Sequence, residues 1–168
     1  MLLVAHSLRG LSFSKLMEVY LEGNRENGVN CYAGETPERQ LALAEEDFRE
    51  YLGRLFFTVE GAEYFILEEA GRYVSALRVE PYEDGLLLEA LETAPGERRK
   101  GYAARLIRET VAHLQKRGPV CLYSHVLRGN AASLHTHEKC GFRQISDCAR
   151  YIDGSVSRRA VTLLYAEN

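Results

Sequence analysis

The feature that most constrains this chain is an apolar stretch that leads into a short basic turn and then into an amphipathic helix. Leu86–Leu91 is almost entirely aliphatic, and Arg98–Ala104 (RRKGYAA) opens a segment of helical periodicity that runs to Gln115. The first backbone N–H groups of a helix have no partner within it, and the helix dipole adds partial positive charge at the same place. The sequence therefore predicts an anion-binding cradle at this turn.

The residues of the turn suit that interpretation. Gly101 lets the backbone approach a ligand closely, and Ala103 keeps the next turn of backbone uncrowded. Arg98, Arg99 and Lys100 bring positive charge to the position where a phosphate would bind. Taken alone, these residues are equally compatible with an ordinary strand-to-helix connection that carries a solvated basic run.

The turn lacks the G-x-x-x-x-G-K-[ST] pattern of nucleotide phosphate loops and the G-x-G-x-x-G pattern of dinucleotide-binding folds, which disfavours a nucleotide-binding protein. It does fit the pattern [QR]-x-x-G-x-[GA], with Arg98, Gly101 and Ala103 at the defined positions. This pattern resembles the coenzyme A pyrophosphate loop of the GNAT superfamily of N-acetyltransferases. The resemblance implies a coenzyme site formed by the strand end and the loop: Leu91, Thr93, Arg98, Arg99, Lys100, Gly101, Tyr102, Ala103 and Ala104.

A second segment carries the resemblance further. The stretch from Asn130 to Phe142 is similar to the GNAT signature N-x-x-A-x-x-x-Y-x-K-x-G-F, which it matches at Asn130, Lys139, Gly141 and Phe142. Ser133 replaces the small alanine, and His137 replaces the tyrosine. The resemblance adds Asn130 and Ser133 to the expected coenzyme contacts. Two motifs in the right order are much more specific than either one alone.

The replacement of tyrosine by His137 leaves two interpretations open. In the family, the tyrosine lies near the coenzyme sulfur and can protonate the departing thiolate. A phenol with a pKa of ~10 remains a donor at neutral pH, whereas a histidine with a pKa of ~6.5 is only partly cationic there. His137 is therefore either a general acid or a polar helix residue that touches the coenzyme without transferring a proton.

The resemblance also suggests where the rest of the chemistry occurs. In GNAT proteins a backbone N–H on the bulged strand before the loop stabilises the oxyanion, and here the matching residues are Leu91, Glu92 and Thr93. Glu89, on the same strand, is the expected general base, because it alternates onto the face of Leu91 and an apolar setting would raise its pKa. There are several alternatives. Glu89 is a solvated residue or a partner for substrate charge, a bulge redirects Glu92, or His125 with Ser124 beside it takes part. Some members of the family use no dedicated base and let water carry the proton, which is a further alternative.

The rest of the sequence predicts alternating elements in one domain spanning residues 1–168. Expected strands are 1–5, 55–59, 64–67, 73–79, 86–93, 120–126, 142–151 and 160–166, and helices follow Ser12, Thr36, Arg98 and Asn130, with a loop over Leu21–Glu35. This order resembles the GNAT layout. It implies a mixed α/β fold with a mostly antiparallel sheet, a parallel pair splayed at the cofactor site and about four flanking helices.

Composition narrows the possible environment and partners. The net charge of −3 argues against nucleic acid, and no apolar run approaches the length of a membrane span. Four cysteines without a C-x-x-C pair indicate free thiols in a reducing cytoplasm rather than a metal site. The first five residues are too short for a signal peptide. Between Glu35 and Ala70 there are ten acidic and three basic residues, which would suit a cationic substrate.

These observations together predict an enzyme that transfers an acetyl group from acetyl-CoA to a primary amine by direct attack. Small polyamine-like or aminoglycoside-like amines suit the acidic region, and a peptide N-terminus or a protein lysine is equally allowed by the motifs. The alternative is a coenzyme A-binding or regulatory module without transferase activity, which the substitution at His137 favours. A homodimer formed through exposed strands is compatible with the fold.

Overall fold

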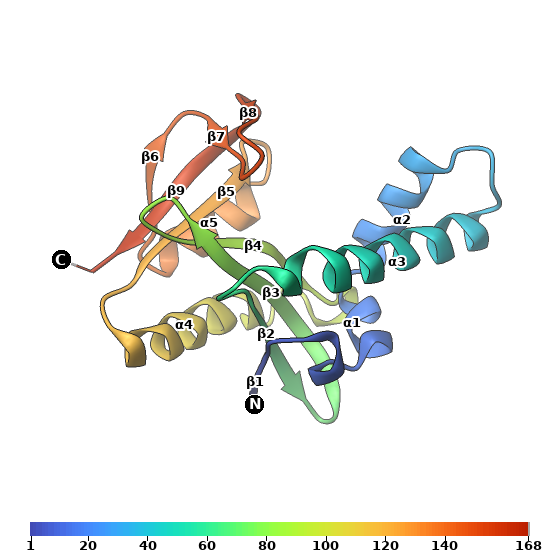
Figure 1. Ribbon diagram of the computed structural model, residues 1–168, viewed down its shortest axis with the longest axis horizontal. Coiled ribbons are helices and arrows are strands. Elements are labelled where there is room, and N and C mark those ends of the chain that lie inside the picture. Colours follow the sequence, from blue (N-terminus) through green and yellow to red (C-terminus); the bar gives the residue numbers. More distant parts are fainter. Residues whose placement is uncertain (168) are drawn as a thin grey trace.

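The computed structural model describes residues 1–167 and is organised around one mixed sheet (Figure 1). Within this range the sheet has seven strands in the order β1-β2-β3-β4-β5-β9-β6, and all neighbours are antiparallel except β4 and β5. The strands are β1 (Leu2–Ala5), β2 (Glu63–Glu69), β3 (Arg72–Tyr82), β4 (Gly85–Thr93), β5 (Cys121–Leu127), β6 (Arg143–Ser146) and β9 (Ala160–Ala166). A small hairpin of β7 (Ala149–Arg150) and β8 (Val156–Ser157) lies beside β9. The predicted mixed α/β class is confirmed.

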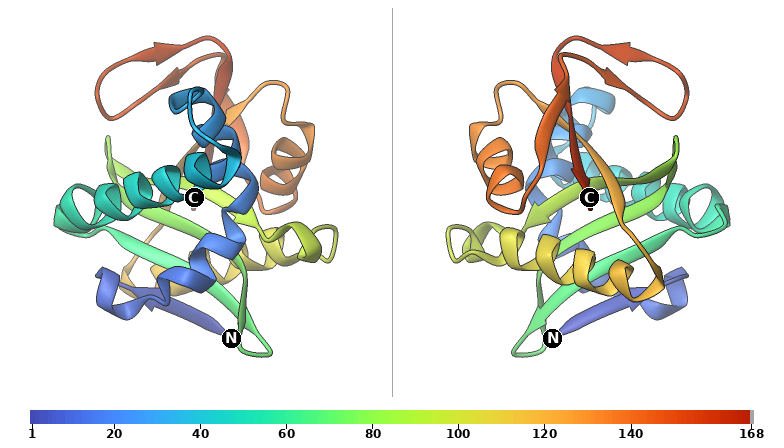
Figure 2. Two further views of the ribbon diagram at one scale, coloured as in Figure 1. Left: turned by 90° about the vertical axis from the view of Figure 1, so that its right-hand side faces the viewer. Right: turned by 90° about the vertical axis from the view of Figure 1, so that its left-hand side faces the viewer.

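The helices lie on both faces of the sheet (Figure 2). One face carries α1 (Phe13–Val19), α2 (Leu21–Cys31) and α3 (Pro37–Arg54), and the other carries α4 (Tyr102–Leu114) and α5 (Ala131–Lys139). Short 3-10 turns connect them at η1 (Leu8–Gly10), η2 (Phe56–Thr58), η3 (Pro95–Glu97) and η4 (Gln115–Arg117). The long α3 extends beyond the sheet with α2 packed along it (Figure 1).

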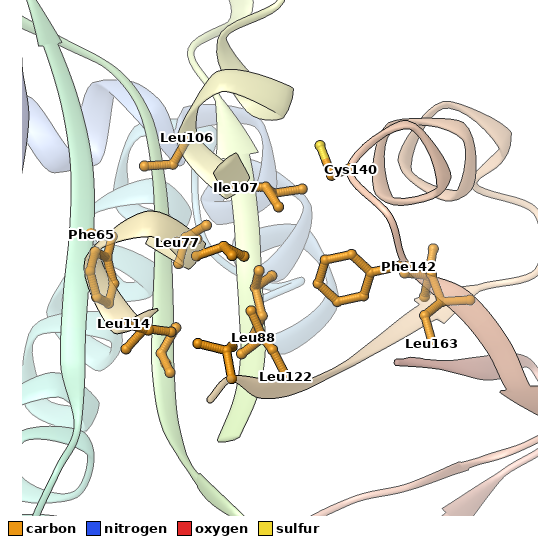
Figure 3. Packing of buried hydrophobic residues seen from close by; sticks show 14 of the residues in the cluster. Phe65, Leu77, Leu88, Leu106, Ile107, Leu114, Leu122, Cys140, Phe142 and Leu163 are labelled. Carbon is orange, nitrogen blue, oxygen red and sulfur yellow. The ribbon is translucent and has the colours of Figure 1, made fainter. Parts of the chain in front are cut away.

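Two buried clusters hold these layers together. Strand β2 contributes to both, because alternate residues of a strand point to opposite faces: Phe65 packs toward α4, and Tyr64 packs toward α1 and α3. The cluster beneath α4 is aliphatic and aromatic and continues to α5 through Cys140 and Phe142 (Figure 3). Both faces of the sheet are therefore anchored, so its strand ends are rigid supports for a site.

Strands β4 and β5 separate after a short parallel ladder. Their pairing covers only Leu86–Leu88 against Leu122–Ser124. On its other side β4 has a bulge. Ala76 of β3 pairs with Glu92, and Arg78 pairs with Glu89. Two residues of β4, Ala90 and Leu91, therefore lie opposite the single residue Leu77 of β3. Ala90 adopts a left-handed φ of 50°. The splayed parallel pair expected from the resemblance is confirmed, and the bulge lies beside it.

The expected loop over Leu21–Glu35 is wrong, because Leu21–Cys31 forms helix α2. Its asparagines and glycines have poor helix propensity, which hid the helix in the sequence. Packing against α3 outweighs that cost. A Cβ atom on Gly28 would lie 2.6 Å from the backbone oxygen of Gln40, so glycine is what allows the two helices to approach so closely. With α2 included, the described residues form five α-helices rather than about four.

Two expected strands are also wrong in detail. Phe56–Thr58 is a 3-10 turn, in which the Thr58 hydroxyl donates to the Leu55 carbonyl and Phe56 packs beneath Tyr64. The stretch 142–151 is divided into β6 and β7, since the Ser146 Oγ accepts a hydrogen bond from the backbone N–H of Cys148 and turns the chain. Apolar content indicated strands in both segments, but local hydrogen bonds from side chains determine the backbone conformation there.

Candidate active site

A cleft of about 560 Å³ lies between the end of β4, the turn before α4 and the start of α5. It brings together every residue predicted for the coenzyme site except Lys100: Leu91, Thr93, Arg98, Arg99, Gly101, Tyr102, Ala103, Ala104, Asn130 and Ser133. The two motifs, some thirty residues apart in the sequence, thus form the walls of one cavity.

The turn before α4 is shaped to surround an anion. Arg99 and Gly101 both adopt left-handed conformations, with φ of 62° and 83°. Gly101 is the N-cap of α4 and has no side chain to accept hydrogen bonds from the first helical N–H groups, which stay available to a ligand. A Cβ atom on Gly101 would meet no protein atom within 4 Å, so it would project into open space.

The positive charges of the turn are distributed unequally. Arg98 is bound to α2, with its Nη2 atom 2.6 Å from Glu22 Oε2, and its Nε also donates to the Thr93 carbonyl. Lys100 turns back to Glu97, at 2.7 Å, which explains why it does not line the cleft. Arg99 and Lys139 line the cleft and form no ion pair within residues 1–167. These two side chains are the free cations of the cavity.

Asn130 and Ser133 are hydrogen-bonded to each other at the N-terminus of α5. The Asn130 Oδ1 atom accepts a hydrogen bond of 3.0 Å from the Ser133 backbone N–H, so Asn130 is the N-cap expected from the motif. Both residues also line the cleft.

The structure does not bring His137 to the cleft. The side chain points into the interior, and the residue is only 1% exposed. Because the Ser133 carbonyl can only accept, Nδ1–H donates to it at 2.8 Å, and Nε2 then accepts from the Ser124 hydroxyl at 3.0 Å. The ring packs edge-on against Phe142, and burial lowers the pKa of His137. Neutral, buried and fully hydrogen-bonded, His137 has the geometry of a structural residue, and neither predicted role, acid or coenzyme contact, is favoured.

A second cavity of about 380 Å³ lies on the opposite side of the bulge, between the sheet and helices α2 and α3. Its walls are mainly aromatic and amide side chains: Tyr20, Asn24, Asn27, Phe48 and Tyr51, with Arg78, Ala90 and Glu92 from the sheet. Glu92 also lines the cleft. Two separate cavities therefore meet at this carboxylate.

The end of β4 at this boundary is firmly held. The Tyr20 hydroxyl donates to the Ala90 carbonyl at 2.7 Å, and the Ser75 hydroxyl donates to the Glu92 carbonyl at 2.7 Å. Burial raises the pKa of the Glu92 carboxyl, and nearby Glu22 adds to this while Arg98 opposes it. A half-buried carboxylate with a raised pKa, at the junction of two cavities, is suited to accept a proton.

Glu89 lies in a different setting from the one expected. It was predicted to share a face with Leu91, but the extra residue of the bulge places Leu91 toward α4 and leaves Glu89 on the opposite face, opposite Arg78. Glu89 Oε2 is 3.1 Å from Arg78 Nε, and the guanidinium lies over the Tyr51 ring. Glu89 lines neither cavity. Burial, together with the Glu89 charge and hydrogen bond, raises the pKa of neighbouring Glu80 to about 7.

His125 also lies outside both cavities. Its ring stands between Tyr82 and Tyr151, with both centroids 5.4 Å away, and Nδ1 is 3.2 Å from the Thr162 hydroxyl. Its Nε2 atom is buried and has no hydrogen-bond partner within residues 1–167. Ser124, beside His125 in the sequence, is the hydrogen-bond partner of His137.

Sequence reasoning missed the residues that α2 and α3 contribute to the second cavity. Asn24 and Asn27 fall in the stretch expected to be a loop, and Phe48 and Tyr51 fall in the helix expected after Thr36, with no function predicted for them. A signal was present, because Asn24, Asn27 and Cys31 recur at helical spacing opposite a face of α3. Only the packing of the two helices shows that these stripes leave a cavity between them.

Two further properties bear on the possible chemistry. Within residues 1–167, no group of three or more His, Cys, Asp or Glu side chains is placed to hold a metal ion. None of the described helices is both long enough and apolar enough to cross a membrane.

Comparison with solved structures shows the same fold in known acetyltransferases. The PaiA N-acetyltransferase from Thermoplasma acidophilum, in complex with coenzyme A, is 14% identical with a TM-score of 0.66 over 99% of both chains. The ribosomal-protein-S18-alanine N-acetyltransferase from Escherichia coli is 20% identical with a TM-score of 0.63, over 99% of this chain and 94% of that one. A comparison with curated proteins gave no significant match.

A protein-family model described as the Acetyltransferase (GNAT) family matches residues 26–142. The matched region includes both motifs, the bulged strand, all of α3 and the second half of α2. Because the match spans more than half of the 168 residues, the chain belongs to the GNAT acetyltransferase family.

Proposed function

We propose that this protein is an acetyl-CoA-dependent N-acetyltransferase that acetylates a primary amine by direct transfer. The observation that carries the proposal is the position of Glu92, which lines both the cleft and the second cavity at the bulge of β4. We assign the cleft to the coenzyme and the second cavity to the acceptor. Direct transfer requires two such sites that meet at a proton acceptor.

The residues of the cleft fit coenzyme A. The left-handed turn, the open space at Gly101 and the uncapped start of α4 suit a pyrophosphate group. Arg99 and Lys139 are available to neutralise phosphate charge. Arg98 has a different part in this proposal, because its ion pair with Glu22 ties the coenzyme turn to the acceptor helix α2.

Bound acetyl-CoA would supply the thioester carbonyl at which acyl transfer takes place. The chain contributes backbone N–H groups of the bulged segment around Leu91, which the resemblance assigns to the carbonyl oxygen as negative charge develops on it. The hydrogen bonds from Tyr20 and Ser75 hold the neighbouring carbonyls of Ala90 and Glu92 away from that position. A rigid donor is worth more than a mobile one, because it need not reorganise during the reaction.

We assign the general base to Glu92 in place of Glu89. Glu92 lines the acceptor cavity, and burial raises the pKa of its carboxyl, which makes it a stronger proton acceptor than an ordinary glutamate. Glu89 is held by Arg78 and reaches neither cavity, so its proposed part is to fix the orientation of Arg78. The buried His137 has no part in proton transfer, and water entering the open cleft is the proposed proton source at the end of the reaction.

One observation favours the alternative, a coenzyme-binding module without transferase activity. The position of the family tyrosine is occupied by His137, which is buried and turned away from the cleft. In the family, a donor at this place assists departure of the thiol. Loss of a single donor usually slows such a reaction without abolishing it, because proton transfer typically contributes about 100- to 10,000-fold.

Isothermal titration calorimetry with acetyl-CoA and free CoA, followed by a thiol-release assay with a panel of primary amines, tests the proposal. We expect saturable binding of both coenzymes and amine-dependent thiol release. Binding without release by any amine would favour the binding module. Absence of binding at millimolar coenzyme would overturn the assignment of the cleft.

A further inference from the structure

We infer that the acceptor is a linear dication, a diamine or polyamine, whose reacting amine lies at Glu92 and whose second ammonium group lies at Asp47. This inference rests on the proposed function and concerns the same acceptor cavity. It follows from the length of the space between α2 and α3, from the charges at its two ends and from one buried side chain in its middle.

The acceptor cavity continues outward along the seam between α2 and α3. A smaller cavity of about 240 Å³ adjoins it and shares four lining residues with it: Asn24, Asn27, Phe48 and Tyr51. On α2 the lining residues run from Asn24 to Cys31, which corresponds to about 10 Å along a helix at 1.5 Å per residue. The two cavities together form what we call the seam groove, a narrow channel that suits an extended chain better than a compact ring system.

The two ends of the seam groove are acidic. Glu92 lies at the inner end and the exposed Asp47 at the outer end. Asp47 forms no ion pair within residues 1–167; its Oδ2 accepts a hydrogen bond from the Tyr32 hydroxyl. The one cation of the lining, Arg78, is matched by Glu89 at 3.1 Å. At the inner end Arg98 lies 3.9 Å from Glu92, but it is closer to Glu22, at 2.6 Å, so two carboxylates share one cation. The inner end therefore keeps an excess of negative charge and the outer end has the unpaired Asp47, which favours a ligand with two positive charges.

The middle of the groove provides apolar surface and one oriented oxygen. Phe48 and Tyr20 have ring centroids 5.1 Å apart, and Tyr51 follows on α3, so an alkyl chain would contact aromatic faces that also attract cations. Asn24 lines both cavities although it is only 4% exposed. Its Nδ2 donates to Met17 Sδ at 3.3 Å, and its Oδ1 has no partner within residues 1–167. This oxygen is not among the fully buried atoms that lack a partner in the described part of the chain, so it is accessible from the groove that Asn24 lines, and it can accept a hydrogen bond from an N–H group of the ligand.

The test compares α,ω-diaminoalkanes with n-alkylamines of equal carbon number, for chains of three to ten carbons, by thiol release with acetyl-CoA. We expect kcat/KM to be about tenfold higher for the longer diamines than for their matched monoamines, as one exposed ion pair and one cation–π contact would provide. The preference should increase with chain length until the diamine spans the groove, at about 10 Å between its nitrogens.

Asp47→Asn isolates the outer end, and Glu46→Gln is its matched control, since Glu46 is exposed on the same helix and lines neither cavity. We expect D47N to lower kcat/KM for the preferred diamine about two- to fivefold, the share of the exposed ion pair alone, and E46Q to leave it unchanged. Asparagine can still accept from Tyr32, so the fold should be preserved.

Two results would overturn the inference while leaving the proposed function in place. One is equal kcat/KM for diamines and matched monoamines, or a diamine preference that D47N does not reduce. The other is a short peptide whose N-terminus reacts faster than any diamine. If acetyl-CoA does not bind, or if no amine of any class releases thiol, both the proposed function and this inference are wrong.

Discussion

The coenzyme cleft and the seam groove meet at Glu92, yet they are built in different ways. Most of the cleft comes from one continuous stretch, residues 91–104, with the start of α5 as its second wall. The seam groove is assembled from Tyr20 and from residues of α2, α3, β3 and β4, which are brought together only by folding. A motif can describe the first kind of site, because its shape is a property of local backbone. It cannot describe the second kind.

The forces that maintain the two regions differ accordingly. In the cleft, left-handed residues at Arg99 and Gly101 and the open N-terminus of α4 shape the space that we assign to the phosphates. In the seam groove, spacing depends on the close approach of helices at Gly28 and on side chains such as Tyr20, which bonds the sheet at Ala90. Changes in the cleft should therefore affect coenzyme binding with little structural cost, whereas groove chemistry depends on packing.

The largest effect is expected at the junction of the two regions. Glu92→Gln should reduce kcat/KM for the amine by about 100- to 10,000-fold, the usual contribution of a general base. Because burial raises the pKa of Glu92, the wild-type rate should increase with pH through a value above the ordinary ~4.3 of a glutamate, and this limb should disappear in E92Q.

Glu89→Gln is the control for that measurement, since it makes the same change three residues earlier on β4. It should leave the pH limb in place and act mainly on stability, by removing the partner of Arg78. If E89Q abolishes the rise of the rate with pH and E92Q does not, the base is Glu89, and the assignment of Glu92 to the junction of the two regions is wrong.

Gly101→Val changes the coenzyme cleft and leaves the residues of the seam groove unaltered. The side chain would enter the space assigned to phosphate, and losing charge-assisted hydrogen bonds there should weaken acetyl-CoA binding on the order of 100-fold by calorimetry. A β-branched residue at φ 83° should also lower the free energy of unfolding by about 1–3 kcal/mol.

Gly96→Ala provides the comparison for that variant. Gly96 also has open space around it, but its φ is not left-handed and it does not line the cleft. We expect unchanged affinity in G96A. Unchanged affinity in G101V as well would show that the turn does not hold the coenzyme.

His137→Ala tests whether His137, although part of a motif, is a structural residue of the core and not a residue of the cleft. The change removes a buried ring and its hydrogen bonds to Ser133 and Ser124, so the free energy of unfolding should fall by about 2–4 kcal/mol in denaturant titrations. Coenzyme affinity and the pH dependence of the folded protein should remain as they were. A shift in the pH–rate profile without loss of stability would restore the general-acid interpretation.

The smallest effect concerns Glu80, beneath the acceptor side of the sheet. In the folded protein its pKa is about 7, whereas in the unfolded chain it returns to ~4.3. The folded state thus binds more protons between these values, so this group makes the free energy of unfolding decrease as pH rises from about 4 to 7. Glu80→Gln should flatten that decrease in denaturant titrations at pH 5 and pH 8. An unchanged difference between the two pH values would show that Glu80 is not the responsible group.

Much of the coenzyme side was predictable from the sequence, because it depends on short-range interactions. The turn around Gly101, the Asn130 cap and the Pro37 start of α3 are each encoded within a few residues, and all three form as expected. The proposed base was less predictable, because the sequence favoured Glu89 and left Glu92 only as an alternative. The bulge redirects the β4 side chains, and it arises from pairing with β3, which is distant in sequence from the coenzyme turn.

By itself, the sequence determined the mixed α/β class, the coenzyme turn and the family, since repeated local patterns and motif spacing need no long-range information. Only the tertiary structure decided that α2 is a helix, that His137 is buried and that Glu92 separates two cavities. Each of these depends on contacts between segments far apart in the chain, where packing outweighs local propensity.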